Sequence, residues 1–180
     1  LWALDAETGA VLWRTLIGNP EIPNLGGVVA RPGLFGNVLV VAGSAGHIVG
    51  LDRETGAVLW EQHRANEACH AGIVAALDSV AVVAGITSAV LGLDPLTGRI
   101  LWERSIGSGT TGMWSTSGDV VLITNGRVVA VDATGSIRWR FPPQYSGTAF
   151  TGGATYNNGL VYAGGYAENK VEFIAVRPPR

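Results

Sequence analysis

Charged side chains, cysteine and lysine are scarce in this chain, and these scarcities limit what it can do. Only 14% of the 180 residues are charged, and the net charge of -2 comes with no cluster of basic side chains. Because binding to a phosphate backbone needs such a cluster, nucleic acid is not an expected partner. The single cysteine, Cys69, has no second cysteine with which to form a disulfide, so it does not indicate the redox compartment.

Long apolar runs and helix-period patterns are also missing. No run reaches the roughly 20 residues that a membrane-spanning helix needs, so we expect no membrane-spanning segment. The hydrophobic content is nevertheless 47%, and the chain has 26 glycines and many Val, Ile and Thr residues. Such a composition predicts an all-β protein of short strands joined by tight turns. Eleven arginines against one lysine, Lys170, is a bias typical of high-GC bacterial genomes.

One sequence pattern occurs four times: Leu or Val, then Asp, then Thr-Gly, then Trp four residues after the Gly. The four aspartates are 47, 42 and 38 residues apart, and an internal period of about 40 residues indicates a repeat architecture. The repeat residues are Asp5, Gly9, Trp13, Asp52, Gly56, Trp60, Asp94, Gly98, Trp102, Asp132, Gly135 and Trp139.

Each copy of the pattern predicts a strand, a tight turn and a second strand. The Asp side chain can accept hydrogen bonds from backbone N–H groups two or three residues on, and Gly supplies the positive φ that closes the turn. The Trp that follows can cover a neighbouring sheet while its N–H donates to a carbonyl. We therefore interpret Asp, Thr, Gly and Trp as structural residues of a hairpin.

A second set of turn signals lies between these hairpins, at residues 35–37, 78–79, 117–119 and 157–159. Each is followed by an apolar stretch, so one repeat contains four antiparallel strands. Four-stranded units at this period predict a β-propeller, similar to WD40 proteins in blade architecture, with about four blades' worth of strands here. Solenoid and helical repeats would need shorter periods or 3.6-residue periodicity, which the chain lacks.

The Ala-Leu-Asp-x-x-Thr-Gly-x-x-x-Trp pattern resembles the tryptophan-docking repeat of the pyrroloquinoline quinone (PQQ) quinoprotein propellers, and the resemblance covers nearly the whole chain. It implies that residues 1–16 end one blade, that 17–60, 61–102 and 103–139 are full blades, and that 140–180 is a partial blade. Because family propellers have seven or eight blades, we expect an arc of such a ring. An isolated arc exposes strand edges, so we expect the isolated chain to be incomplete or oligomeric.

A closed ring of four blades is the alternative architecture. In that ring the strand at residues 11–15 would complete the last blade and residues 1–4 would be left spare. The last repeat also departs from the pattern, because Arg177-Pro178-Pro179 stands where the Asp and its turn are expected. The docking geometry of the family favours the wider ring.

The acidic residues offer no evident catalytic pair. Ten of the fourteen belong to repeat turns, hairpin turns or the position after a Trp, which leaves four scattered glutamates. The one local group of metal-ligand residue types is His63, Glu67, Cys69 and His70, whose spacing matches no strong zinc pattern. We interpret that group as a loop, and we predict neither catalytic nor metal-binding residues.

The loops between blades are the expected place for binding, because a rigid propeller brings them together on one face. The candidate stretches are 19–24, 62–70, 110–114 and 141–150. Within them His70, Trp114 and Tyr145 offer aromatic or amphipathic contact surfaces. The alternative, that these stretches only cap the blades, stays open.

Three functional hypotheses follow. The first is a non-catalytic PQQ-like propeller, a scaffold that binds a protein or peptide on its loop face or joins missing blades, with no cofactor. Relatives implied by the resemblance include an outer-membrane assembly lipoprotein and sensor-like propellers of bacterial kinases, which favours an exported protein.

The second hypothesis is a fragment of a PQQ-dependent dehydrogenase of alcohols or sugars, with the quinone and calcium at the propeller axis. The third hypothesis is a propeller hydrolase or lyase, and no residue in the sequence favours it over the other two.

Overall fold

The computed structural model describes residues 1–17, 32–43, 46–64, 69–86, 89–106, 115–117, 119–124, 126–142, 154–167 and 170–178. Regular structure in these ranges consists of β-strands that form five antiparallel sheets, numbered here sheets 1 to 5 along the chain. No helix in the described ranges is long and apolar enough to cross a membrane.

The bounds of the strands follow the repeat. Sheet 1 contains β1 (Trp2–Leu4) and β2 (Val11–Arg14). Sheet 2 contains β3 (Gly33–Phe35), β4 (Val38–Ala42), β5 (His47–Asp52) and β6 (Val58–His63). Sheet 3 contains β7 (Cys69–Leu77), β8 (Val80–Ile86), β9 (Ala89–Leu93) and β10 (Ile100–Ser105). Sheet 4 contains β11 (Ser115–Ser117), β12 (Val120–Thr124), β13 (Val128–Asp132) and β14 (Ile137–Phe141). Sheet 5 contains β15 (Ala154–Asn157), β16 (Leu160–Ala167) and β17 (Lys170–Val176).

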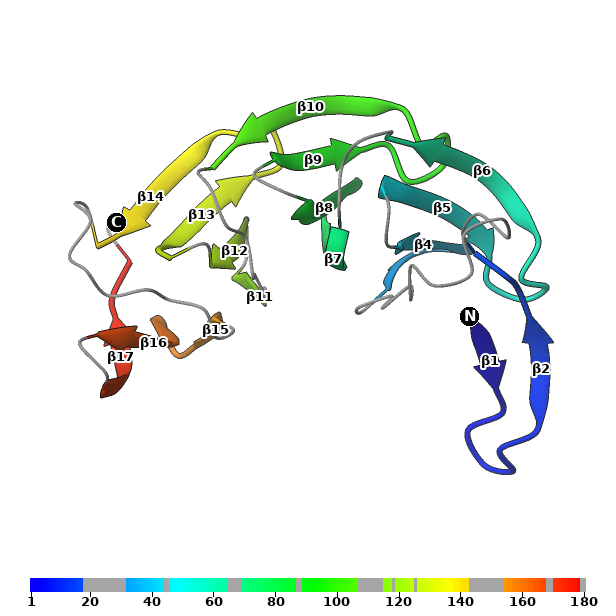
Figure 1. Ribbon diagram of the computed structural model, residues 1–180, viewed down its shortest axis with the longest axis horizontal. Helices are drawn as coiled ribbons and strands as arrows, with labels where there is room; N and C mark the ends of the chain where they lie inside the picture. The colour runs from blue at the N-terminus through cyan, green and yellow to red at the C-terminus, as the bar shows by residue number, and fades with distance from the viewer. Residues whose placement is uncertain are drawn as a thin grey trace.

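The five sheets follow one another along an arc, as Figure 1 shows. In each complete sheet the strands are in sequence order, with β6, β10 and β14 on the outer rim and β7 and β11 toward the inside. This arrangement confirms the predicted arc of a β-propeller with four-stranded antiparallel blades. Sheets 1 and 5 lie at opposite ends of the arc, and β2 pairs with β1, so the alternative four-blade ring is not formed.

The predicted second hairpins are present in sheets 2 to 5. The pairs that flank their turns are Phe35 with Val38, Leu77 with Val80, Ser117 with Val120, and Asn157 with Leu160.

The outer strands of sheets 2 to 4 end a few residues later than the blade ends expected at residues 60, 102 and 139. Strands β6, β10 and β14 continue past Trp60, Trp102 and Trp139, because residues beyond each Trp still pair with the preceding strand.

The core lies between consecutive sheets. On one face of sheet 2, Val40, Ala42 and Ile48 pack against buried residues of sheet 3. On the other face, Val49 and Leu51 pack against Trp13 and Ile17, which belong to or follow sheet 1. Because both faces of the middle strands are buried, their sequences read as continuous apolar runs rather than as alternation.

Candidate binding surface

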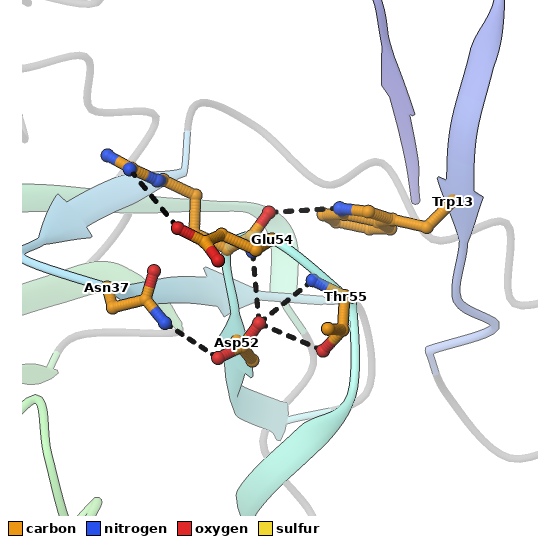
Figure 2. A network of polar contacts seen from close by, with 6 residues as sticks. Trp13, Asn37, Asp52, Glu54 and Thr55 are labelled. Carbon is orange, nitrogen blue, oxygen red and sulfur yellow. Dashed lines mark hydrogen bonds and ion pairs between the residues drawn. The ribbon is translucent and has the colours of Figure 1, made fainter.

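The repeat turn is built around one carboxylate, as Figure 2 shows for sheet 2. Oδ1 of Asp52 accepts hydrogen bonds from the backbone N–H of Glu54 (3.0 Å) and from both the N–H (2.8 Å) and the hydroxyl (2.9 Å) of Thr55. Oδ2 accepts a bond from the side-chain amide of Asn37 at 2.7 Å. Gly56 closes the turn with φ of 72° and donates its N–H to the Asp52 carbonyl. Glu54, Thr55 and Gly56 lie within four residues of the Asp, so the turn itself forms from local sequence, whereas Asn37 reaches it from the hairpin between β3 and β4.

Hydrogen bonding lowers the pKa of these aspartates. For Asp5 the largest cause is the Thr8 hydroxyl, and for Asp52 it is the backbone N–H of Thr55, because each bond favours the ionised carboxylate. The backbone N–H of Leu96 is the largest cause for Asp94.

The pKa of Asp132 is also lowered, although by a different balance. Burial is the largest single effect and raises it, but the hydrogen bonds from Thr134 and Ser136, together with the positive charge of Arg138, outweigh that effect. All four repeat turns therefore favour the ionised carboxylate.

These pKa shifts predict acid sensitivity with a defined sign. A carboxyl whose pKa is lower in the folded state stabilises the fold above its unfolded pKa of about 4, and this stabilisation is lost as the pH falls through the folded value. The Asp52→Asn variant keeps an acceptor for the turn but has no proton to gain. Urea unfolding at about pH 6 and about pH 3 should show a smaller loss for this variant than for the parent chain. An equal loss in both would contradict the assignment.

The repeat tryptophans connect one sheet to the next. Trp13, Trp60 and Trp102 each donate the indole N–H to the carbonyl that follows the repeat Asp of the next sheet. The acceptors are Arg53 (2.9 Å), Pro95 (2.9 Å) and Ala133 (2.7 Å). Figure 2 shows the first of these contacts. Each ring also lies on the turn glycine of that next sheet: a Cβ added to Gly56, Gly98 or Gly135 would be 2.4 to 2.6 Å from a ring atom. One motif thus holds two blades together.

A small residue lies opposite each Trp within its own sheet, and the sequence analysis did not identify it. Gly50 pairs with Trp60 and Gly92 pairs with Trp102, and a Cβ at either glycine would be 2.2 or 2.1 Å from the indole. The corresponding partners of Trp13 and Trp139 are Ala3 and Ala130. The signal in the sequence is a Gly or Ala two residues before each repeat Asp.

Among the described residues, the docking contacts are not repeated at either end of the arc. Gly9 has the same turn geometry, with φ of 72°, but nothing lies within 4 Å of its Cβ position. No described residue accepts a hydrogen bond from the Trp139 indole. The contact between an indole ring and a turn glycine is therefore described between consecutive sheets from sheet 1 to sheet 4, at Gly56, Gly98 and Gly135, and not at the two ends.

A polar cluster marks the loop face, which is the end of sheet 2 opposite its repeat turn. His47 begins β5 and pairs with His63 at the end of β6, and their rings stack with centroids 4.3 Å apart. Nδ1 of His47, which is buried, lies 3.1 Å from the Glu61 carboxylate. Arg64 forms a two-pronged ion pair with Glu103 of β10, at 3.1 Å for each nitrogen, which links sheets 2 and 3.

The predicted loop-face residues lie mostly beyond what the structure describes. Trp114, Tyr145 and Glu67 are outside the described residues, and of His70 only the backbone position, in β7, is described. The loop after β6 is shorter than the predicted 62–70, because residues 62 and 63 pair with β5 and 69 and 70 belong to β7. His63 stacks on His47, a residue that the sequence analysis did not single out. In the described ranges no three His, Cys, Asp or Glu side chains are grouped to hold a metal ion.

The four-stranded sheets, their arc and the tryptophans that join them define a β-propeller. No protein-family model and no curated protein sequence matches the chain. Among solved structures, it is similar to BamB from Moraxella catarrhalis, with a TM-score of 0.71, 22% identity, and coverage of 94% of this chain and 50% of that one.

Two further solved structures are similar. The quinohemoprotein alcohol dehydrogenase from Comamonas testosteroni has a TM-score of 0.65 and 14% identity over 98% of this chain and 40% of that one. The computationally designed Ika4 protein has a TM-score of 0.62 and 18% identity, covering 84% and 92%. At these identities the likeness shows the fold alone. The chain spans half the length of BamB and 40% of the dehydrogenase.

Proposed function

We propose that this propeller region is a non-catalytic scaffold that binds a protein or peptide partner on its loop face. The observation that carries the proposal is how the acidic side chains are used. The four repeat aspartates accept hydrogen bonds inside their own turns, Glu61 contacts His47, and Glu103 pairs with Arg64. Carboxylates engaged in this way hold the scaffold together, which leaves them poorly suited to act as general bases.

The loop face has the chemistry of a recognition surface. His63 is exposed beside the buried His47, and Glu61 and Glu103 are partly exposed on the same side. Imidazole, guanidinium and carboxylate groups on rigid strands can fix the orientation of a polar partner, while loops above them supply further contacts. The tryptophan contacts between sheets fix the strands that carry these side chains. The loop-face surface is therefore preformed in the absence of a partner.

A photo-crosslinking amino acid placed at His63 should capture a discrete partner in an extract of the cells that produce the chain. The same amino acid placed at Glu54, in the repeat turn at the opposite end of sheet 2, is the matched control and should capture none. Excess chain without the crosslinker should compete the adduct away, because a specific site saturates. Equal capture at both positions, or no adduct at His63, would contradict the proposal.

A fragment of a PQQ-dependent dehydrogenase is the second candidate, favoured by the similarity in fold to the quinohemoprotein alcohol dehydrogenase. By resemblance the quinone and calcium would lie at the axis, next to the inner strands β3, β7, β11 and β15. Calcium binds through oxygen ligands, mainly carboxylates, and the anionic quinone needs cationic partners. The described side chains of the inner strands, such as Phe35, Val74, Leu77, Thr155 and Tyr156, include no carboxylate and no cationic group. This composition supports the scaffold over the dehydrogenase.

We therefore expect PQQ with calcium to give no saturable heat of binding in calorimetry. We also expect no dye-linked oxidation of simple alcohols or sugars. Saturable, calcium-dependent binding with turnover would overturn the scaffold proposal in favour of the dehydrogenase.

A further inference from the structure

Three exposed arginines lie on the outer rim of the arc, on strands that belong to neighbouring sheets. They are Arg104 on β10 and Arg138 and Arg140 on β14, and these two strands follow one another along the rim (Figure 1). The two strands are far apart in the sequence, so this basic cluster arises from the fold and not from a run of basic residues. We call these three side chains the arginine seam.

The strand registers place the arginine seam between sheets 3 and 4. Directly opposed residues of an antiparallel pair have their side chains on the same face of the sheet. Arg104 is opposite Val90 in sheet 3, and Arg140 is opposite Val129 in sheet 4. Both valines are buried in the core between these two sheets. Arg104 and Arg140 therefore face the same seam from its two sides.

Two of the three guanidinium groups reach the repeat turn of sheet 4. Nε of Arg104 donates to the Gly135 carbonyl at 3.0 Å, and Nη1 of Arg138 donates to Oδ2 of Asp132 at 3.4 Å. The Arg138 side chain is still 57% exposed, and no described carboxylate pairs with Arg104 or Arg140. Three positive charges thus share one described carboxylate, which leaves guanidinium N–H donors available for an anion.

Arg140 reverses the charge that sheets 2 and 3 carry at its position. The residue after the repeat Trp is Glu61 in sheet 2 and Glu103 in sheet 3, but Arg140 in sheet 4. Between sheets 2 and 3, Arg64 pairs with Glu103. The residue of sheet 3 that corresponds to Arg64 is Ile106, which is buried in the core between sheets 3 and 4. Both members of the ion pair are therefore replaced between sheets 3 and 4, and the position becomes basic without a described acid.

We propose that the arginine seam binds an extended acidic segment of a partner protein, one with Asp or Glu at alternate positions. Alternate residues of a strand lie on one face about 7 Å apart, so Arg138 and Arg140 are spaced as the alternate side chains of an extended peptide are. Each guanidinium offers a planar fork of donors that matches a carboxylate. A single phosphate would instead need donors that converge on one point. The test does not involve His63, so this proposal and the loop-face proposal can fail independently.

The test uses the full chain and a fluorescein-labelled peptide, Gly-Thr-Glu-Val-Glu-Val-Glu-Thr-Gly. Fluorescence anisotropy should show saturable binding that weakens as salt is added, because exposed ion pairs are screened. A peptide with Gln in place of each Glu should bind about tenfold more weakly or worse, because the charge-assisted hydrogen bonds are lost. A third peptide of the same composition, with its three Glu residues adjacent, should also bind more weakly than the first, because its carboxylates no longer share one face.

Chain variants locate the site. Arg140→Gln should weaken binding of the Glu peptide about tenfold, as expected for one lost charge-assisted hydrogen bond, and Arg140→Glu should abolish it. Arg53→Gln removes one exposed charge from sheet 2 and is the matched control, so it should leave the affinity within about twofold of the parent chain. Circular dichroism checks that the variants fold; if one does not, the three peptides decide the question with the unchanged chain.

Several outcomes would overturn the proposal. They are the absence of saturable binding, equal affinity for the Glu and Gln peptides, and equal weakening by Arg140→Gln and Arg53→Gln. Inorganic tripolyphosphate is the competitor that distinguishes the two kinds of anion. If it displaced the Glu peptide at a concentration below that of unlabelled Glu peptide, the arginine seam would be a phosphate site and not a site for an acidic segment.

Discussion

Replacing Trp102 by alanine should lower the free energy of unfolding by about 3–5 kcal/mol, the range for truncating a well-packed tryptophan. The ring packs against the core between sheets 3 and 4, and it lies on both Gly92 in its own sheet and Gly135 in the next. Its N–H donates to the Ala133 carbonyl at 2.7 Å. Truncation therefore opens a void between two blades and leaves a carbonyl without its donor. Urea unfolding followed by circular dichroism measures the change.

Two further variants separate the parts of this contact. Trp102→Phe keeps an aromatic ring but loses the hydrogen bond, so its cost should be smaller, with about 1 kcal/mol due to the lost bond. Trp139→Ala should also cost less than Trp102→Ala, because among the described residues the Trp139 indole has neither a hydrogen-bond acceptor nor a repeat turn to cover. If the losses at Trp102 and Trp139 were equal, docking on the next blade would not be the source of the stability.

The repeat turn could be predicted from the sequence because the residues that close it are local. Asp52, Thr55 and Gly56 lie within five residues, and their hydrogen bonds follow from residue type alone. The period of about 40 residues then gives the four-stranded blade and the propeller. By contrast, the docking of Trp13 on Arg53 and Gly56 joins residues about forty positions apart. The sequence indicates that a tryptophan packs somewhere, but only the stacking of blades determines on what.

The loop-face cluster was harder to predict for the same reason. His63 was grouped with Cys69 and His70 because these residues are close in sequence. Its ring instead stacks on His47, sixteen residues earlier, because β5 and β6 are antiparallel and place these two residues opposite each other. The pair could have been found by extending the strand register from the repeat turn, since His47 lies five residues before Asp52 and His63 seven after Gly56.

Replacing Gly98 by alanine should destabilise the chain more than the same change at Gly9. The two glycines have nearly equal φ, 71° and 72°, and each donates its N–H to the carbonyl of its repeat Asp at 2.9 Å. The backbone strain of an alanine at positive φ, about 1–2 kcal/mol, is therefore common to both variants. Only Gly98 has a ring above it: a Cβ there would lie 2.4 Å from Cε3 of Trp60.

The difference between the two variants isolates the docking contact from the turn. Pushing the Trp60 ring away should add about 1–3 kcal/mol at Gly98, the usual cost of overpacking, and should strain its hydrogen bond to Pro95. Unfolding by urea at neutral pH gives both values, and the Gly9 variant corrects for the turn itself. A double variant Gly98→Ala with Trp60→Ala should lose less than the sum of the single changes, because the clash disappears with the ring. Additive losses would mean that Gly98 is required only for its backbone conformation, and the close approach of the indole would then contribute nothing to holding the blades together.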